Sequence, residues 1–541
     1  MRRILLLLTL VIATAAGLRA QQSPRLLVVL VVDQMRADYL TVFDRHWRGG
    51  FRTLLDQGVV FENARYPYMN TWTCAGHATI STGTLPRTHG MVANAWWDRE
   101  TKRSVACTFD PAAPNISYGE PVPRTSPAGD DDDGPGNSPS RLRVPTLADE
   151  LRAQQPGARV VTLSMKARSA IGLAGHAGDA VVWYDAGARS FVTSAAYTSA
   201  PVASVKFFME RYPIARDNGR PWSLLAPADS YVMRDAGVGE RPPTGWTGLF
   251  PHVPMGRDGA DGRFYTQWQY TPFADAYLGE MAAWLVDDFK LGQRDAADFL
   301  GISFSVLDTV GHEFGPDSRE VEDVLRRLDL TLDALIDSLD AQVGRANYQL
   351  VLTADHGVPP IAMAPRSARV ANEDIRDRIE ETLTEAFGTR AEGPYVAALS
   401  SAEIIFAPGV FGPLTGTPAV RAAVAHAVED IPGVDRVLWA DQLSEESPDR
   451  AIRSAALGHV DGRSGDLVLV PDEYWYFGRT TGGTTHGSYH DYDQHVPLIV
   501  FGGGVSPRHD ASAVTPADIA PTLARFGGVR LPRAEGRALV D

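Results

Sequence analysis

The chain has 541 residues, of which 44% are hydrophobic and 22% are charged, a composition typical of globular proteins and unlike that of disordered or fibrous chains. This length corresponds to several ordinary domains or to one large α/β domain that carries insertions. Acidic residues outnumber basic residues by 66 to 51, and no compensating basic block occurs, so we expect no nucleic-acid partner.

The N-terminus has the pattern of a secretory signal peptide. Two arginines precede an apolar run at residues 4–16, and small residues follow it. Residues 1–20 are therefore expected to be cleaved, which leaves an exported chain, periplasmic or secreted, from 21 to 541. No later stretch has the ~20 continuous apolar residues of a transmembrane helix, so no membrane span is expected in the mature chain. Export would permit a disulfide between Cys74 and Cys107, and two reduced buried thiols are the alternative.

Five apolar runs predict the strands of a central sheet. The first, at residues 26–32, is continuously apolar and β-branched, which is typical of a strand buried on both faces of a parallel sheet, and it ends at Asp33. The later runs lie at residues 159–164, 298–307, 348–353 and 496–502. A short helix is predicted at 146–154, and a longer one at 321–339, where apolar residues recur at helical spacing. This order predicts an α/β fold with a central, mostly parallel sheet and helices on both faces.

Three segments interrupt this pattern and are predicted to be insertions into a single domain. They lie at about residues 100–145, 186–295 and 366–480. The first contains an acidic, Gly/Pro-rich stretch at 129–140, for which a solvated loop is the main interpretation and a calcium site the alternative. We expect the other two to shape access to a site that the sheet builds. No internal repeat is apparent.

Acids and histidines gather where the predicted strands end. In chain order they are Asp33, Asp308, His312, Asp355, His356 and His486. Ligands of open α/β sheets bind outside the carboxyl ends of the strands, so we expect these side chains to converge. One strand-end aspartate alone usually caps a helix, but the whole set indicates a site. Aspartate and histidine are ligands of Zn²⁺, and two ions about 4 Å apart would need about six of them.

The best candidate nucleophile is Thr73, in the segment NTWTCAGHATISTG. The small residues at 78–83 that follow it are compatible with the start of a helix. A hydroxyl near a helix N-terminus experiences a positive potential, and a bound metal would lower its pKa further. An ordinary turn with a capping threonine is the alternative.

Together these motifs resemble those of the alkaline phosphatase superfamily, in the branch that contains nucleotide pyrophosphatase/phosphodiesterases and phosphate-irrepressible alkaline phosphatases. The matching elements, in order, are VVDQMR, TxxGH, SMKAR, DTVGHEFGP, TADHG and THGSYHDYDQHVPLIVFG. The resemblance implies an alkaline phosphatase-like fold and two zinc ions per chain. The ligands it implies are Asp308, His312 and His486 for one ion, and Asp33, Thr73, Asp355 and His356 for the other. It also implies that Thr73 forms a phosphothreonine intermediate.

Lys166 and Arg168 bear on the choice of substrate. They follow the run at 159–164, where alternate side chains point to the same side of a strand end, although solvated charges are the alternative. The resemblance to phosphate-irrepressible monoesterases implies that both, together with Asn94, contact phosphoryl oxygens. Two cations attract a dianionic monoester more strongly than a monoanionic diester. The sequence therefore predicts a phosphomonoesterase that acts on small-molecule phosphate esters.

Other functions compete with this interpretation. A phosphodiesterase or nucleotide pyrophosphatase on the same scaffold would prefer an apolar or aromatic slot for a base or a second ester group, which the Trp- and Tyr-rich segment at 186–295 could build. A non-catalytic, zinc-stabilised binding protein would need no Thr73. A sulfatase is disfavoured because Cys74 lacks the Cys-x-Pro-x-Arg context, and a phosphoglycerate mutase because it uses a serine nucleophile. Four further histidines near the motifs are expected to be structural or to support the ligand residues: His77, His176, His490 and His495. The sequence predicts neither the physiological ester nor the oligomeric state.

Overall fold

The computed structural model describes residues 25–120, 134–362, 368–400, 402–478 and 482–540. The predicted signal peptide and the first part of the acidic stretch at 129–140 lie outside the described residues. Among the described residues, no helix combines the length and the apolar character that crossing a membrane requires.

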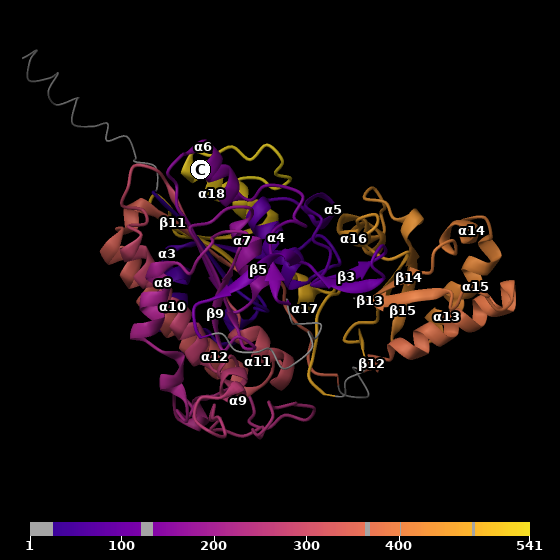
Figure 1. The fold of residues 1–541 in the computed structure, drawn as a ribbon, viewed down its shortest axis with the longest axis horizontal. Helices are drawn as coiled ribbons and strands as arrows, with labels where there is room; N and C mark the ends of the chain where they lie inside the picture. Colours follow the sequence, from indigo (N-terminus) through magenta and orange to yellow (C-terminus); the bar gives the residue numbers. More distant parts are fainter. Residues whose placement is uncertain (1–24, 121–133, 363–367, 401, 479–481, 541) are drawn as a thin grey trace, which may run out of the picture.

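A sheet of eleven strands forms the centre of the fold, in the order β19-β2-β18-β11-β1-β10-β7-β8-β9-β5-β6 (Figure 1). The strands are β1 (Leu26–Val32), β2 (Val59–Ala64), β5 (Phe109–Ser117), β6 (Gly136–Asn137), β7 (Val160–Ser164), β8 (Ala180–Asp185), β9 (Ser190–Ser194), β10 (Asp298–Phe304), β11 (Tyr348–Thr353), β18 (Leu498–Gly502) and β19 (Arg508–Val514). Strands β11, β1, β10, β7 and β8 run parallel to one another. Strand β18 is antiparallel to both of its neighbours, and β9 and β5 continue the other side in antiparallel pairing. The α/β fold is confirmed. The sheet is mixed, because antiparallel strands flank its parallel centre.

Strand β1 shows why the first apolar run is continuous. All seven of its residues are buried. Leu26, Val28, Leu30 and Val32 pack on one face with helices α10 (Pro272–Asp288) and α12 (Arg319–Gln342). Leu27, Val29 and Val31 pack on the other face with α7 (Ala167–Ala174) and α18 (Ile519–Gly527). With helices on both faces, neither set of alternating side chains reaches water.

The predicted short helix is α6 (Leu147–Gln154), and the predicted long helix is α12. Thr146 and Asp149 form a capping box that starts α6. The strand predicted at 298–307 is too long, because β10 ends at Phe304 and helix α11 (Val306–Phe314) begins directly after it. The buried Asp275 carboxylate accepts the backbone N–H groups of Ser305 and Val306 and so starts this helix in the manner of a cap.

The segment at 186–295 packs against the central sheet and includes α8 (Ala203–Arg211), α9 (Gly262–Trp268) and α10. Trp222 and Trp268 are fully buried, and the rings of Phe191 and Tyr277 stack at a centroid distance of 5.6 Å. These aromatic residues therefore serve as core on one face of the sheet. The slot suggested for a diesterase does not arise from them.

The segment at 366–480 forms a second sheet, in the order β13-β14-β16-β15. Its strands are β13 (Val396–Ser400), β14 (Glu403–Phe406), β15 (Val434–Trp439) and β16 (Leu467–Pro471). Helices α13 (Asn372–Phe387) and α15 (Pro418–Glu429) lie on the side of this sheet away from the central one (Figure 1). A separate hydrophobic cluster, which includes Ile379, Val424 and Leu469, fills its interior.

Further α-helices and strands complete the described part of the fold. The helices are α2 (Tyr39–Val42), α3 (Gly50–Gln57), α4 (Thr73–Thr82), α5 (Pro86–His89), α14 (Phe411–Thr415), α16 (Arg450–Gly458) and α17 (Asp491–Gln494). The strands are β3 (Ala95–Asp98), β4 (Arg103–Ala106), β12 (Arg369–Val370) and β17 (Tyr476–Phe477). Of these elements, α4 and the β3–β4 hairpin bear directly on the functional site.

Candidate active site

Asp308, His312 and His486 form the first of two groups of acids and histidines. One carboxylate oxygen of Asp308 lies 3.2 Å from Nε2 of His312 and 3.9 Å from Nε2 of His486. Helix α11 places Asp308 and His312 one turn apart on one face, while His486 comes from the loop before α17. One ligand atom from each residue lies within 4.8 Å of the others, a spacing suited to one metal ion.

The second group surrounds His356. Its Nε2 lies 3.5 Å from a carboxylate oxygen of Asp33 and 3.5 Å from one of Asp355. The Thr73 Oγ1 is 3.4 Å from the same nitrogen. The rings of His356 and His486 stack at a centroid distance of 3.5 Å, so the two groups adjoin. Asp308 also lies within reach of Asp33 and His356 and thus faces both groups.

Each of the three histidines is oriented by a backbone carbonyl. The Nδ1 atoms of His312, His356 and His486 lie 2.8, 3.0 and 2.7 Å from the carbonyl oxygens of Thr484, Gly357 and Thr71. Donation of the Nδ1 proton to these carbonyls leaves each Nε2 lone pair directed at the acids, as in histidine ligands of metals.

The charges of the site favour bound cations. Asp33, Asp308 and Asp355 are all buried, and one oxygen each of Asp33 and Asp355 has no hydrogen-bond partner among the described residues. Burial raises the pKa of Asp33 well above its ordinary value, and the Asp308 and Asp355 carboxylates raise it further. Burial also lowers the pKa of His486 well below its ordinary value, which keeps the imidazole neutral. Crowded buried carboxylates beside the neutral imidazole of His486 fit a metal centre.

Thr73 is the first residue of helix α4. Its hydroxyl therefore lies at the positive end of the helix dipole, beside the second group. Gly76, one turn further along, allows α4 to approach closely, because a Cβ atom there would lie 2.4 Å from the carbonyl oxygen of Asp355. The small-residue pattern of this segment thus brings the nucleophile candidate against the end of β11.

Lys166 lies between the two groups. Its Nζ is 2.7 Å from Asp33 Oδ2 and also contacts Asp308 Oδ2. The strand alternation expected to align Lys166 with Arg168 is wrong, because β7 ends at Ser164 and Arg168 lies in the first turn of α7. Arg168 is nevertheless buried. Burial and the like charge of Arg168 lower the pKa of Lys166, but the Asp308 and Asp33 carboxylates outweigh them and raise it above its ordinary value.

Comparison with known proteins identifies the family. Residues 27–493 match the family described as Type I phosphodiesterase / nucleotide pyrophosphatase. The chain belongs to this family. It is 31% identical to the alkaline phosphatase PafA of Elizabethkingia meningoseptica, over 96% of this chain and 95% of that protein. The crystal structure of wild-type PafA superposes with a TM-score of 0.84 at 29% identity, covering 96% of this chain and 98% of that one.

Two further relatives match at similar levels. The alkaline phosphatase PhoV of Synechococcus elongatus is 30% identical over 96% of this chain and 92% of its own length. A protein of Myroides odoratus named calcium-transporting ATPase is 30% identical over 94% of this chain and 93% of its own. These relatives, and the large mixed sheet shared with PafA, support the resemblance drawn from the sequence motifs.

Asn94 joins the segment that carries Thr73 to the β3–β4 hairpin. Its side-chain Oδ1 accepts a hydrogen bond of 3.0 Å from the backbone N–H of Cys74, next to Thr73. The backbone N–H of Cys107 donates to the carbonyl oxygen of Asn94 at 2.8 Å. The structure also pairs Cys74 and Cys107 in a disulfide with a Cα–Cα distance of 6.7 Å, which resolves the alternative left open by the sequence. Asn94 is therefore held on both sides.

Replacing both Cys74 and Cys107 by alanine should lower the free energy of unfolding by about 3–4 kcal/mol. The bridge closes a loop between residues 33 apart, and its loss restores that entropy to the unfolded chain. Urea unfolding of the purified double variant and of the wild type, each with and without dithiothreitol, measures the difference. Equal midpoints for the oxidised wild type and the variant would contradict the prediction.

Two residues that support the site differ in how visible they are in the sequence. His77 lies within the TxxGH motif, and its ring contacts the Thr73 carbonyl at 2.9 Å and Asp355 Oδ2 at 3.3 Å. Asp493 was not predicted. Its Oδ2 accepts hydrogen bonds from the backbone N–H groups of Gly487 and Ser488 and from the Ser488 hydroxyl, which fixes the loop that carries His486. Asp493 lies within the THGSYHDYDQHVPLIVFG motif, but the motif alone does not assign it this role.

The other histidines make structural contacts outside the two groups. His176 pairs with Asp149 at 2.8 Å, His490 lies 3.0 Å from the Pro471 carbonyl, and His495 lies 2.9 Å from the Glu62 carbonyl. Their contacts agree with the structural role expected for them.

Proposed function

We propose that this protein is an exported, two-zinc phosphomonoesterase that hydrolyses small-molecule phosphate monoesters through a phosphothreonine at Thr73. The observation that carries the proposal is the position of the Thr73 hydroxyl, at a helix N-terminus and 3.4 Å from His356 Nε2, beside two adjoining Asp/His groups. The names of PafA and PhoV, which match almost the whole chain, support a phosphoric monoester hydrolase. Export rests on the pattern of residues 1–20.

The two groups divide the proposed zinc ligands between them. Asp308, His312 and His486 would hold one ion, and Asp33, Asp355 and His356, with Thr73, would hold the other. When bound, zinc lowers the pKa of a coordinated hydroxyl and neutralises charge on phosphoryl oxygens.

The residues of the chain then have distinct tasks. Thr73 Oγ1 attacks phosphorus in line with the leaving alcohol, so that the O–P bond to threonine forms as the ester O–P bond breaks. Water cleaves the resulting phosphothreonine and releases phosphate, which restores the hydroxyl. The positive end of the α4 dipole stabilises the attacking oxygen.

The groups that bind the transferred phosphoryl are Asn94, Lys166 and Arg168. The Lys166 ammonium lies beside both acid groups, so its charge is placed at the reacting centre. Because Asn94 Oδ1 already accepts from the Cys74 N–H, its amide N–H groups are the ones left to donate to a phosphoryl oxygen. Such charge-assisted donors stabilise the transition state most when they are already oriented.

Protein purified without chelators should contain close to two zinc ions per chain, measured by elemental analysis. The change His486→Ala should reduce this to about one, because the group around His356 keeps its own ligands. The variant His176→Ala is a matched control, since that ring pairs with Asp149 away from the site. A full zinc content in His486→Ala, or full phosphatase activity in metal-free protein, would contradict the assignment.

The decisive test of the function compares two substrates. Steady-state kcat/KM is measured for an aryl phosphate monoester and for the methyl diester of the same phenol. We expect the monoester to be preferred, because Lys166 and Arg168 add positive charge to the site. A faster diester reaction would replace the proposal with a phosphodiesterase, and no turnover of either ester would support a zinc-stabilised binding protein.

A further inference from the structure

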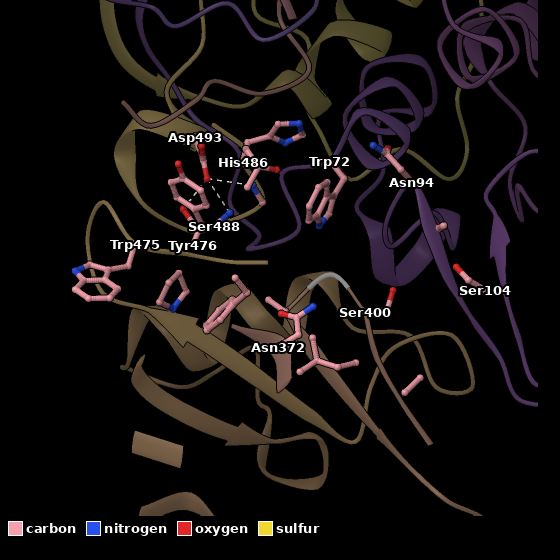
Figure 2. Close-up of a pocket in the computed structure, with 18 of the residues that line it drawn as sticks. Trp72, Asn94, Ser104, Asn372, Ser400, Trp475, Tyr476, His486, Ser488 and Asp493 are labelled. Carbon is pink, nitrogen blue, oxygen red and sulfur yellow. Dashed lines mark hydrogen bonds between the residues drawn. The ribbon is translucent and has the colours of Figure 1, made fainter. Parts of the chain in front are cut away.

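A cavity of about 540 Å³ opens between the central sheet and the second sheet, and Figure 2 shows 18 of the residues that line it. Trp72, Asn94 and His486 line it from the side of the active site, and Ser400 at the end of β13 and Asn372 at the start of α13 line it from the opposite side. Asn94 and His486 also belong to the proposed catalytic machinery, so the cavity adjoins the reacting centre. Its volume is within the usual range for small-molecule sites.

Trp97 lines the cavity but belongs to none of the hydrophobic clusters found among the described residues. In strand β3 the side chains alternate, so Trp96 and Trp97 point to opposite faces. Trp96 is buried in the small core beside the disulfide, whereas Trp97 is only half-buried and lines the cavity. Its indole makes no ring contact and no hydrogen bond with another described residue. A large aromatic surface is thus left toward the cavity.

The strand that carries Trp97 is anchored beside the active site through Asn94. Trp97 comes three residues after Asn94 in the sequence. Strand β3 pairs with β4, where Ser104 lies directly across from Trp97 and also lines the cavity. The hydrogen bonds of Asn94 to Cys74 and Cys107 fix the base of this hairpin. A group stacked on Trp97 is therefore held in a defined relation to Asn94.

The remaining walls indicate what kind of group fits. Trp72, Phe477 and Tyr492 add further aromatic surface. The acidic group on the wall, Asp493, is occupied by the N–H groups of Gly487 and Ser488. The basic group, Arg376, lies on an exposed part of α13. A second anionic group would therefore find no buried cation among the described residues that line this cavity, whereas a flat, uncharged ring would find aromatic surface.

We propose that this cavity binds the organic group of the substrate, and that the preferred group is an uncharged aromatic ring stacked on Trp97. The inference rests on the proposed phosphomonoesterase function and adds the substrate class to it. The phosphoryl group binds at Thr73, Asn94 and Lys166, while the ring of the leaving alcohol occupies the cavity beside His486. An alkyl ester of the same charge would use the same phosphoryl contacts but would leave the aromatic walls uncovered.

The test compares benzyl phosphate with methyl phosphate. Both are esters of primary alcohols with leaving groups of similar basicity, so a difference in kcat/KM reports mainly on contacts to the ring. Wild-type enzyme should prefer the benzyl ester by ~10-fold or more, the effect of one buried and stacked ring. The change Trp97→Ala should remove most of this preference while keeping the methyl phosphate rate within about twofold, and Trp97→Phe should restore part of it.

Phe207→Ala is the matched control, because Phe207 is a half-exposed aromatic residue that stacks on Trp284 in a part of the fold away from the cavity. It should leave both rates and their ratio unchanged. Equal rates of the wild type on the two esters would overturn the inference. An equal loss of kcat/KM for benzyl phosphate and methyl phosphate in Trp97→Ala would also overturn the inference, because such a result would show that Trp97 only supports the hairpin. Absence of turnover of either ester by zinc-loaded wild type would instead overturn the proposed function.

Discussion

Thr73→Ala should lower kcat/KM for a phosphate monoester by at least ~10⁴-fold, since removing a covalent nucleophile leaves only the contribution of binding and charge. The substitution should be tolerated by the fold. The Thr73 carbonyl still accepts the hydrogen bond from His77, and alanine is a good helix former at the start of α4. Thr73→Ser keeps a hydroxyl at the same place, so this variant should retain a measurable part of the activity.

The intermediate gives a second measurement on the same residue. Acid-quenched enzyme, trapped during turnover, should carry phosphate on the peptide that contains Thr73, and this label should be missing in Thr73→Ala. The zinc content of the alanine variant serves as its control, because a general collapse of the site would lower the metal content of both groups. Phosphate on another peptide, or an alanine variant with substantial activity, would refute the assignment of the nucleophile.

Lys166→Ala should lower kcat/KM for a monoester by ~10²-fold or more, which corresponds to about 2.7 kcal/mol of lost transition-state stabilisation. The diester rate should fall much less, because the lysine interacts more strongly with a dianionic substrate than with a monoanionic one. Rates on an aryl monoester and its methyl diester measure the two effects in one preparation. Lys206→Ala, at an exposed lysine on α8, should change neither rate.

Because Lys166 contacts proposed zinc ligands, the zinc content of the Lys166→Ala variant is a necessary control. The Lys166 Nζ is 2.7 Å from Asp33 and also contacts Asp308, so its removal alters the charge balance of both proposed ligand groups. A variant that keeps two zinc ions and loses activity mainly on the monoester supports a direct role toward the phosphoryl group. Equal losses on both substrates would show that Lys166 serves the metal groups or the fold instead.

The sequence by itself determined the layers of the fold and most of the candidate site. The run at 26–32 predicted a strand covered on both faces, and all seven residues of β1 are buried, because local hydrophobicity reports directly on burial. The acids and histidines found near the strand ends converge in the structure. Parallel strands present their carboxyl ends at one edge of a sheet, so topology brings such residues together once the strands are identified.

The sequence pattern predicted the boundary less reliably wherever a helix directly follows a strand. The expected strand at 298–307 stops at Phe304, and Arg168 lies on α7 instead of on a strand end. Asp275, 30 residues before Ser305, accepts the N–H groups that start α11. Such a boundary depends on a side chain from elsewhere in the chain, and the apolar run alone does not show it.

Only the tertiary structure decided the surroundings of the site. His486 is oriented by the carbonyl of Thr71, 415 residues away in sequence. The second sheet supplies part of the far wall of the cavity, and many of the aromatic residues at 186–295 pack as core. Sequence pattern reports which side chains are buried, but which distant segments meet depends on how the insertions pack on the sheet, and this is set by contacts between complementary surfaces.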